Sequence, residues 1–476
     1  MADAGKNLRK NDLFRVEITE MNNLGNGVGR LSGGYREDGT VVFVKGAVTG
    51  ETVEAVAIKL NKSYIVGKLH KIVTRSVKRE DVDLCRAPLG CGGCIYRPIS
   101  YEYEKELKRE YVESCFRREG MGDVTVLPVL STGKVRGYRN KGQYPVAMGK
   151  NGVEAGFYAA KSHRLIPAAD CALQPQIFAE IVTFLCSYAT RHKISVYNEE
   201  RGTGLIRHFY LRVGEGTGEV LVTVVARDAN FPHGYDMARE LRKRFPAVVG
   251  VLLNIQPDNT NVVLGDRYIT LDGASVLKDR LCGLEFSIDP AAFWQVNHDG
   301  AELLYGLAAE RAALTGRETL LDLYCGIGSI GLSMADRVKE LIGIEIVPEA
   351  VRCAKENAEH NGITNASFYC GDASSAEAFL SAAEETRGEK IRADVVIIDP
   401  PRKGTTRELI DSIAARQIPR VVYVSCGADT LARDCKYFLE KGYEIGEVQP
   451  VDLFPRTGHV ESVVCLTRRL DVDMRR

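Results

Sequence analysis

Three cysteines lie within ten residues in the segment CRAPLGCGGC, as Cys85, Cys91 and Cys94. Thiols this close together in sequence are typical of metal ligands, and four-cysteine ligation suits either a structural zinc or an iron–sulfur cluster. The 13 cysteines are an odd number, and the N-terminus lacks an apolar leader, so a disulfide framework is not expected. Cys115 is one candidate for the missing fourth ligand, although it falls on the apolar face of a predicted helix.

A second reactive group is predicted at Cys426, in the segment SCGAD. A thiol at the point where a parallel strand ends and a helix begins lies at the ligand-binding edge of the sheet, close to backbone N–H groups that favour thiolate. Most cysteines are small buried hydrophobes. The flanking Gly427 and the nearby DPPR segment favour a nucleophile here. Glu461 opens the last predicted strand, where a catalytic base and a surface glutamate are equally compatible with its position.

The C-terminal third alternates strands and amphipathic helices, which predicts a doubly wound parallel sheet. The strands are expected at 319–324, 340–346, 366–370, 393–399, 420–425, 443–448 and 460–466. A G-x-G-x-x-G turn follows the first strand, and Glu345 ends the second, where its carboxylate can accept hydrogen bonds from ribose hydroxyls. Asp322 before the turn and the DPPR segment favour S-adenosylmethionine over a nicotinamide dinucleotide.

The rest of the chain shows different patterns of apolar and polar residues. Residues 12–74 alternate short β-rich runs with glycine turns, which predicts a small antiparallel barrel of about five strands. A helix is expected at 100–119, and a mixed α/β region from about 130 to 285. Two basic segments, 59–79 and 134–144, interleave lysine and arginine with tyrosine, a mixture suited to RNA phosphates and base stacking.

Composition is that of an ordinary globular protein, with 45% hydrophobic and 26% charged residues among 476. A formal net charge of zero argues against a uniformly basic nucleic-acid binder but leaves local patches possible. No run approaches the roughly 18 apolar residues needed to cross a bilayer. We therefore expect a cytoplasmic protein without a membrane partner, and we assume a monomer.

Taken together, these segments resemble the S-adenosylmethionine-dependent RNA uracil-5-methyltransferases, most closely the branch that acts on 23S ribosomal RNA with an N-terminal TRAM domain and an iron–sulfur cluster. The likeness covers nearly the whole chain. It is carried by CRAPLGCGGC with a distant cysteine, FWQVN at 293–297, DLYCGIGSIGL, DPPRKG and SCGADTLARD.

The resemblance implies three domains: a TRAM-like RNA-binding β-barrel at 1–80, a central α/β domain at 81–290, and a Rossmann-like methyltransferase domain at 291–476. It implies that Cys171 completes the ligands of a [4Fe-4S] cluster, with zinc as the alternative. It also implies that Cys426 is the nucleophile and Glu461 the general base. The residues implied to line the cofactor and substrate pocket are Gln295, Tyr324, Gly326, Gly328, Glu345, Asp372 and Asp399.

The implied reaction methylates C5 of a uridine in RNA, with 23S ribosomal RNA as the expected partner. A thiolate adds to C6, C5 displaces the methyl group from the sulfonium, and a base removes the C5 proton. The alternatives are a transfer-RNA uracil-5-methyltransferase, an RNA cytosine-5-methyltransferase, or a non-catalytic RNA-binding ribosome-assembly factor. Radical S-adenosylmethionine enzymes usually space their cysteines as C-x3-C-x2-C, whereas this chain has C-x5-C-x2-C.

Overall fold

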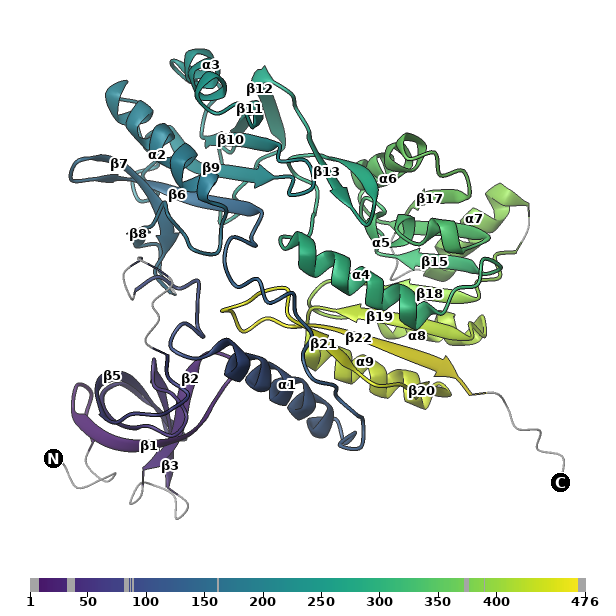
Figure 1. Ribbon diagram of the computed structural model, residues 1–476, viewed down its shortest axis with the longest axis horizontal. Coiled ribbons are helices and arrows are strands. Elements are labelled where there is room, and N and C mark those ends of the chain that lie inside the picture. Colours follow the sequence, from purple (N-terminus) through teal and green to yellow (C-terminus); the bar gives the residue numbers. More distant parts are fainter. Residues whose placement is uncertain are drawn as a thin grey trace.

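The computed structural model describes residues 8–31, 39–80, 85, 87, 90–160, 162–371, 376–388 and 390–469. Figure 1 shows a small barrel, a central sheet with two helices on one side, and a C-terminal sheet between helices. The long helix α1 (Tyr101–Arg118) runs from the barrel to the C-terminal part. Among the described residues, none of the helices is both long and apolar enough to cross a lipid bilayer.

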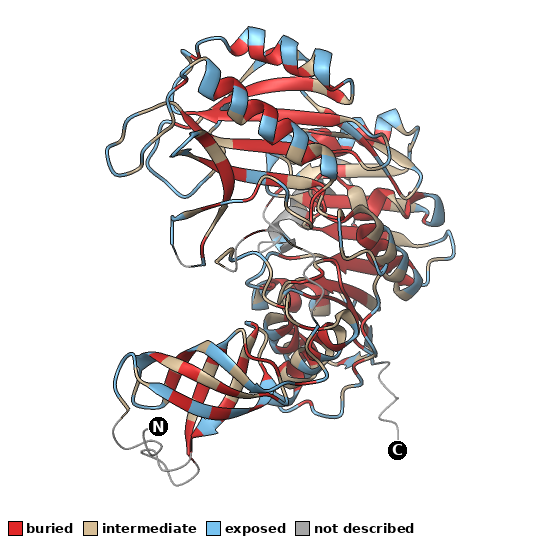
Figure 2. Ribbon diagram, turned by 60° about the vertical axis from the view of Figure 1, so that its left-hand side comes forward, coloured by how far each residue is buried: buried red, intermediate tan, exposed pale blue. Residues whose placement is uncertain are grey.

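The N-terminal part is a closed five-stranded barrel, as the sequence pattern predicts, but it is not wholly antiparallel, because β3 and β5 pair in parallel. Buried and exposed residues alternate along its strands, because successive side chains of a strand point to opposite faces. Figure 2 shows this alternation on the barrel. Its strands, joined in the order β1-β2-β3-β5-β4, are β1 (Leu13–Met21), β2 (Asn26–Leu31), β3 (Thr40–Lys45), β4 (Thr52–Leu60) and β5 (Tyr64–Thr74).

The central part is a seven-stranded sheet, with α2 (Gln176–Arg191) and α3 (Gly234–Arg244) on one face (Figure 1). Its apolar core lies under these helices, because strands β9 and β10 direct Phe209, Val222 and Val224 towards them. The strands, in spatial order, are β12 (Arg267–Gly273), β11 (Val248–Ile255), β10 (Val220–Ala226), β9 (Ile206–Val213), β6 (Lys141–Gly149), β7 (Gly152–Tyr158) and β8 (Leu165–Pro167). A hairpin of β13 (Leu277–Leu281) and β14 (Leu284–Ile288) leads to the C-terminal part.

The C-terminal sheet has the order β17-β16-β15-β18-β19-β22-β20, and β21 also pairs with β22. Strands β15 to β19 are parallel, as predicted, but β22 runs antiparallel to β19. The strand expected at 443–448 is shorter, ending at Ile445 as β20, and a separate strand β21 follows from Gln449. The strands are β15 (Thr319–Leu323), β16 (Glu340–Glu345), β17 (Ala366–Cys370), β18 (Val395–Ile398), β19 (Arg420–Ser425), β20 (Tyr443–Ile445), β21 (Gln449–Val451) and β22 (Glu461–Arg468).

Helices cover both faces of this sheet (Figure 1). They are α4 (His298–Ala312), α5 (Ser329–Leu332), the 3-10 helix η1 (Ala335–Arg337), α6 (Pro348–His360), α7 (Ala376–Arg387), α8 (Arg407–Ala415) and α9 (Ala428–Glu440). One face of the C-terminal sheet carries an apolar core, in which the apolar face of α1 packs together with α9. Cys115 lies in that core, where its sulfur accepts a hydrogen bond from Arg118 at 3.0 Å. Its side chain is therefore committed to packing rather than to ligation.

A buried ion pair fixes α1 to the segment before β22. Lys108, which is 1% exposed, donates to Glu104 and to Asp452, both at 2.8 Å. The backbone N–H of Arg456 donates to the same Glu104 at 2.6 Å, and Tyr138 of the central part donates to the carbonyl of Pro455 at 2.9 Å. The segment 452–456 is thus held from two sides, immediately before the strand that begins with Glu461.

Candidate active site

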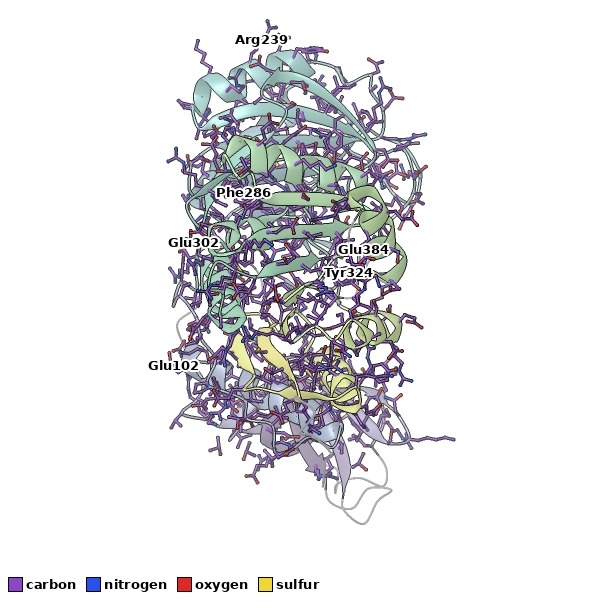
Figure 3. The ribbon with its side chains drawn as sticks, turned by 90° about the vertical axis from the view of Figure 1, so that its right-hand side faces the viewer. Glu102, Arg239, Phe286, Glu302, Tyr324 and Glu384 are labelled. Carbon is purple, nitrogen blue, oxygen red and sulfur yellow. The ribbon has the colours of Figure 1, made fainter. Side chains whose placement is uncertain are left out.

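The glycine turn after β15 opens towards the carboxyl edge of the sheet. Tyr324 has φ +64°, and its hydroxyl lies 3.3 Å from the hydroxyl of Thr405 (Tyr324 is labelled in Figure 3). A Cβ atom at Gly326 would meet no other atom within 4 Å, so the backbone there faces open space. Gly328 has φ +83°, a conformation that side chains other than glycine rarely adopt. The turn therefore presents bare backbone where a ligand can approach.

Two carboxylates shape this turn. Glu345 accepts hydrogen bonds from the N–H groups of Gly326 at 3.0 Å and Val347 at 2.9 Å. Asp322 accepts from the N–H of Gly331 at 2.9 Å, while its second oxygen is buried without a partner. Burial raises the pKa of Asp322 to about 7. Both side chains lie at the strand end where sequence reasoning placed them.

Cys426 and Glu461 are brought together by strand register. In the antiparallel pair of β19 and β22, Ser425 lies opposite Ser462, so the next residues along, Cys426 and Glu461, also face each other. Cys426 is partly exposed, whereas Glu461 is only 4% exposed. A reachable thiol therefore lies beside a buried carboxyl group, at the same edge of the sheet as the glycine turn.

The electrostatics of this corner couple three predicted residues. Burial, and then the neighbouring Glu461 and Asp399, raise the pKa of the Cys426 thiol to about 11, and Arg402 opposes this rise. Burial, with a contribution from Asp399, raises the pKa of Glu461 to about 8, again opposed by Arg402. Burial raises the pKa of Asp399 to about 7. Glu461 and Asp399 can therefore gain or lose a proton near neutral pH, as acid–base catalysts must.

Gln295 lies on the segment that enters α4. Its side chain is buried, and its backbone carbonyl accepts a hydrogen bond from Asn140 at 2.9 Å. Phe293, two residues earlier, is 69% exposed. Asp372 falls outside the described residues, so its predicted contact with the cofactor stays a prediction.

Sequence reasoning missed several residues at this edge. Arg402 has no predicted role of its own beyond the DPPR segment, yet its charge acts on both Cys426 and Glu461. Ile346 and Val347 directly follow Glu345, and they are 59% and 46% exposed. Exposed apolar residues next to the Glu345 carboxylate suit an apolar or aromatic ligand group. In the sequence, these two residues could have been recognised as an apolar pair that follows the end of a buried strand.

The four cysteines predicted as ligands lie near one another. Burial first, and then the charges of Cys171, Cys85 and Cys91, raise the pKa of Cys94 to about 12. The pKa of Cys171 is raised to about 11 by burial and, in part, by Cys85 and Cys91. Within the described ranges, however, no group of three or more His, Cys, Asp or Glu side chains could hold a metal ion, so the predicted four-cysteine metal site is not shown.

A mainly parallel open sheet, a bare glycine turn, a carboxylate at the end of the next strand and a strand-end thiol beside a buried carboxyl group are the arrangement expected of an S-adenosylmethionine-dependent methyltransferase. Residues 237–469 match the family model described as tRNA (Uracil-5-)-methyltransferase. A Bacillus cereus protein named as an uncharacterized RNA methyltransferase is 37% identical over 462 residues, which cover 97% of this chain and 98% of the relative. A similarly named protein of Caldanaerobacter subterraneus is 38% identical, with 96% and 98% covered.

The chain belongs to this family, and it is an S-adenosylmethionine-dependent RNA uracil-5-methyltransferase. Its fold is also that of the Pyrococcus abyssi tRNA (uracil-54, C5)-methyltransferase, solved in complex with S-adenosyl-L-homocysteine. The TM-score is 0.74 at 24% identity, with 95% of this chain and 100% of the other covered.

Proposed function

We propose that this enzyme methylates C5 of uridine through a covalent bond between Cys426 and C6 of the ring, with Glu461 as the general base. The observation that carries the proposal is the register that places a partly exposed thiol opposite a buried carboxyl group. S-adenosylmethionine supplies the methyl group as a substrate. Gln295, Tyr324, Gly326, Gly328, Glu345, Asp372 and Asp399 are proposed to line its pocket and that of the uracil.

The Cys426 thiol first gives its proton to water. Its sulfur then bonds to C6, and the C5–C6 double-bond electrons move into an enolate. C5 then bonds to the methyl carbon as the carbon–sulfonium bond breaks, which leaves S-adenosylhomocysteine. Glu461 takes the C5 proton, the double bond reforms, and Cys426 leaves with the electron pair of the carbon–sulfur bond. C5 and C6 are shielded in a stacked helix, so the target uridine must be unstacked.

Substitutions at the two residues test the proposal. With uridine-containing RNA and methyl-labelled S-adenosylmethionine, Cys426→Ala should neither methylate nor form a protein–RNA adduct. Glu461→Gln should form the methylated adduct but release it slowly, so a labelled covalent complex should accumulate on a denaturing gel. Cys370→Ala, which changes an exposed cysteine, should behave as the wild type. Normal turnover by Cys426→Ala would refute the adduct.

We also propose that Cys85, Cys91, Cys94 and Cys171 hold a [4Fe-4S] cluster with a structural role. The support is the mutual electrostatic effect of the four thiols, together with the resemblance. The loop of the first three cysteines packs beside β8, because Gly90 lies against Ile166 and Cys91 bridges to Ala159. The cluster would tie this loop to the segment between β8 and α2.

Anaerobically purified protein tests this proposal without an activity assay. About four irons and four sulfides per chain, lost in Cys94→Ser but kept in the matched Cys115→Ser, would support it. One zinc per chain, lost in the same variant, would favour the alternative centre. Iron-free and zinc-free wild-type protein that folds normally would refute both.

The proposed substrate is 23S ribosomal RNA, with the barrel at 1–80 as an RNA-binding domain, the central domain at 81–290 and the methyltransferase domain at 291–476. The likeness of the barrel and the cysteine segment to the ribosomal branch supports this choice. Transfer RNA is the second candidate, because the solved Pyrococcus protein of the same fold acts on tRNA. Mapping 5-methyluridine in total RNA with and without the gene identifies the molecule and the position together. Loss of the mark from tRNA alone would refute the ribosomal choice.

A further inference from the structure

The central sheet has one face covered by α2 and α3, and a second face without helices among the described elements (Figure 1). We call this second face the polar face, because β9 directs His208, Tyr210 and Arg212 to it. Cross-strand register adds Lys141 of β6 opposite Arg212, and Thr223 of β10 opposite Tyr210. One end of the face is apolar and packs on the C-terminal part near Trp294. The polar face therefore borders the segment that carries Gln295.

Buried polar atoms on this face lack partners. The side chains of His208, Arg212, Thr223 and Tyr268 each have a buried nitrogen or oxygen without a hydrogen bond within the described part of the chain. Arg212 is 4% exposed; it donates to the hydroxyl of Tyr210 at 2.8 Å and to the carbonyl of Ala292, but its third nitrogen is unpaired. Buried polar groups are nearly always satisfied, so these four atoms have unused hydrogen-bonding capacity on one face of the sheet.

The charges on the face are also unbalanced. Lys141 lies directly opposite Arg212, and like charges in this cross-strand position repel. Arg139 lies two residues before Lys141. None of the three forms an ion pair with an acidic residue of the described chain. Burial, and then the charges of Arg212 and Arg139, lower the pKa of Lys141 to about 8. A bound anion would stabilise the charged form of this lysine.

This cationic group is linked to the active site. His459 has its pKa lowered by burial and then by Arg402, Lys108 and Arg139, so Arg139 and Arg402 approach the same histidine. Arg402 in turn acts on the Cys426 thiol. The charges of Arg139 and Arg402 therefore both act on His459, and that of Arg402 acts also on the Cys426 thiol. The aromatic rings expected to share this role, Tyr138 and Tyr144, are both fully buried, so they cannot stack on bases.

We propose that Lys141, Arg139 and Arg212 bind one backbone phosphate of the RNA strand whose uridine enters the active site. A phosphodiester offers several acceptor oxygens and one negative charge, which match an ammonium group and two guanidinium groups. It would offset the like charges of Lys141 and Arg212. The inference rests on the proposed function, because it takes RNA as the ligand.

The test compares Lys141→Gln with Lys243→Gln, a control on an exposed position of α3 on the other side of the sheet. Binding of a single-stranded uridine-containing oligonucleotide is measured by fluorescence anisotropy at several salt concentrations. Loss of one phosphate contact should lower the slope of log K against log salt by about 0.7. Lys141→Gln should show this loss and a raised KM with kcat within two-fold, and Lys243→Gln should match the wild type. Replacing phosphates one at a time by methylphosphonates should weaken wild-type binding at one position and leave Lys141→Gln unaffected there.

A thermal unfolding scan separates this role from a structural one. Lys141→Gln should unfold at a higher temperature than the wild type, because it removes repulsion from the RNA-free protein, whereas loss of a structural contact would lower that temperature. Binding of S-adenosylhomocysteine should be unchanged. An unaltered salt slope in a folded Lys141→Gln variant would overturn the phosphate site and leave uridine methylation standing. Absence of methylation by the wild type, with the expected change in slope, would overturn the proposed function and leave the phosphate site standing.

Discussion

The reactivity of the Cys426 thiol before RNA binds is a quantitative consequence of its surroundings. Burial, Glu461 and Asp399 raise its pKa from an ordinary 9.0 to about 11, against the charge of Arg402. We expect this thiol to be slow towards iodoacetamide in the free enzyme. We expect Arg402→Gln to make it slower still, because the variant removes the cation that opposes the rise in pKa.

The magnitude follows from two opposing effects. At pH 8, a shift of two pKa units lowers the thiolate fraction about 100-fold. A more basic thiolate is also a better nucleophile, which raises its rate constant for alkylation about ten-fold over two pKa units. Net alkylation should therefore be about ten-fold slower than for an unperturbed thiol. If Arg402→Gln raises the pKa by about one further unit, as loss of an adjacent charge does, the same reasoning predicts a further fall of about three-fold.

Peptide mass spectrometry after timed alkylation measures Cys426 separately from the other cysteines. The exposed Cys370 serves as the internal reference in the same sample. The rate at Cys426 should climb steadily from pH 7 to pH 10 without levelling off. A rate equal to that of Cys370 at pH 8, a plateau below pH 9, or an Arg402→Gln variant that reacts faster would refute the reasoning.

Three further predictions concern the carboxyl groups and the buried lysine. The pKa of Glu461 is about 8, so adduct breakdown in single-turnover experiments should rise about ten-fold between pH 6 and 7 and level off above 8; a flat profile would exclude this base. The pKa of Asp399 rises to about 7 on folding, so the native state binds a proton that the unfolded chain releases above about pH 4. This bound proton adds on the order of 4 kcal/mol to the free energy of unfolding below about pH 4, and the contribution is lost as the pH rises through 7. Asp399→Asn should therefore lose less stability than the wild type between pH 5 and 8 in urea unfolding, and an equal loss would contradict the assignment. Lys108→Met should destabilise by about 3–5 kcal/mol, because Glu104 and Asp452 remain buried without their cation. Lys105→Met, in an exposed pair on the same helix, should cost less than about 1 kcal/mol, and similar costs for both would refute the role of burial.

Local pattern predicted much of the scaffold. The alternation in residues 12–74 specifies strands with one buried face, and a barrel is the compact solution for five such strands. The helix expected at 100–119 is α1, one residue shorter at each end, because Ser100 accepts a hydrogen bond from the N–H of Tyr103 as its cap. The turn between β15 and α5 also follows from sequence, since its glycines adopt backbone conformations that other residues avoid.

Pattern failed where the face of a residue depends on distant partners. Tyr138 and Tyr144 look like stacking residues in a basic segment, but both point into the interior. One donates to the carbonyl of Pro455 and the other contacts Gln174, residues that only the folded chain brings near. Whether the cations of the same segment bind RNA stays a prediction, and one of them, Lys134, forms ion pairs with Glu215 and Asp299.

The sequence by itself determined which chemical groups this enzyme carries: a strand-end thiol, a carboxylate in the last strand and a glycine turn for a nucleoside. Only the tertiary structure decided that they meet. Cys426 faces Glu461 because β22 returns antiparallel beside β19, a pairing between segments 35 positions apart that no local pattern encodes. The pKa values follow from the same event, because the pairing buries Glu461, and burial penalises its charged form.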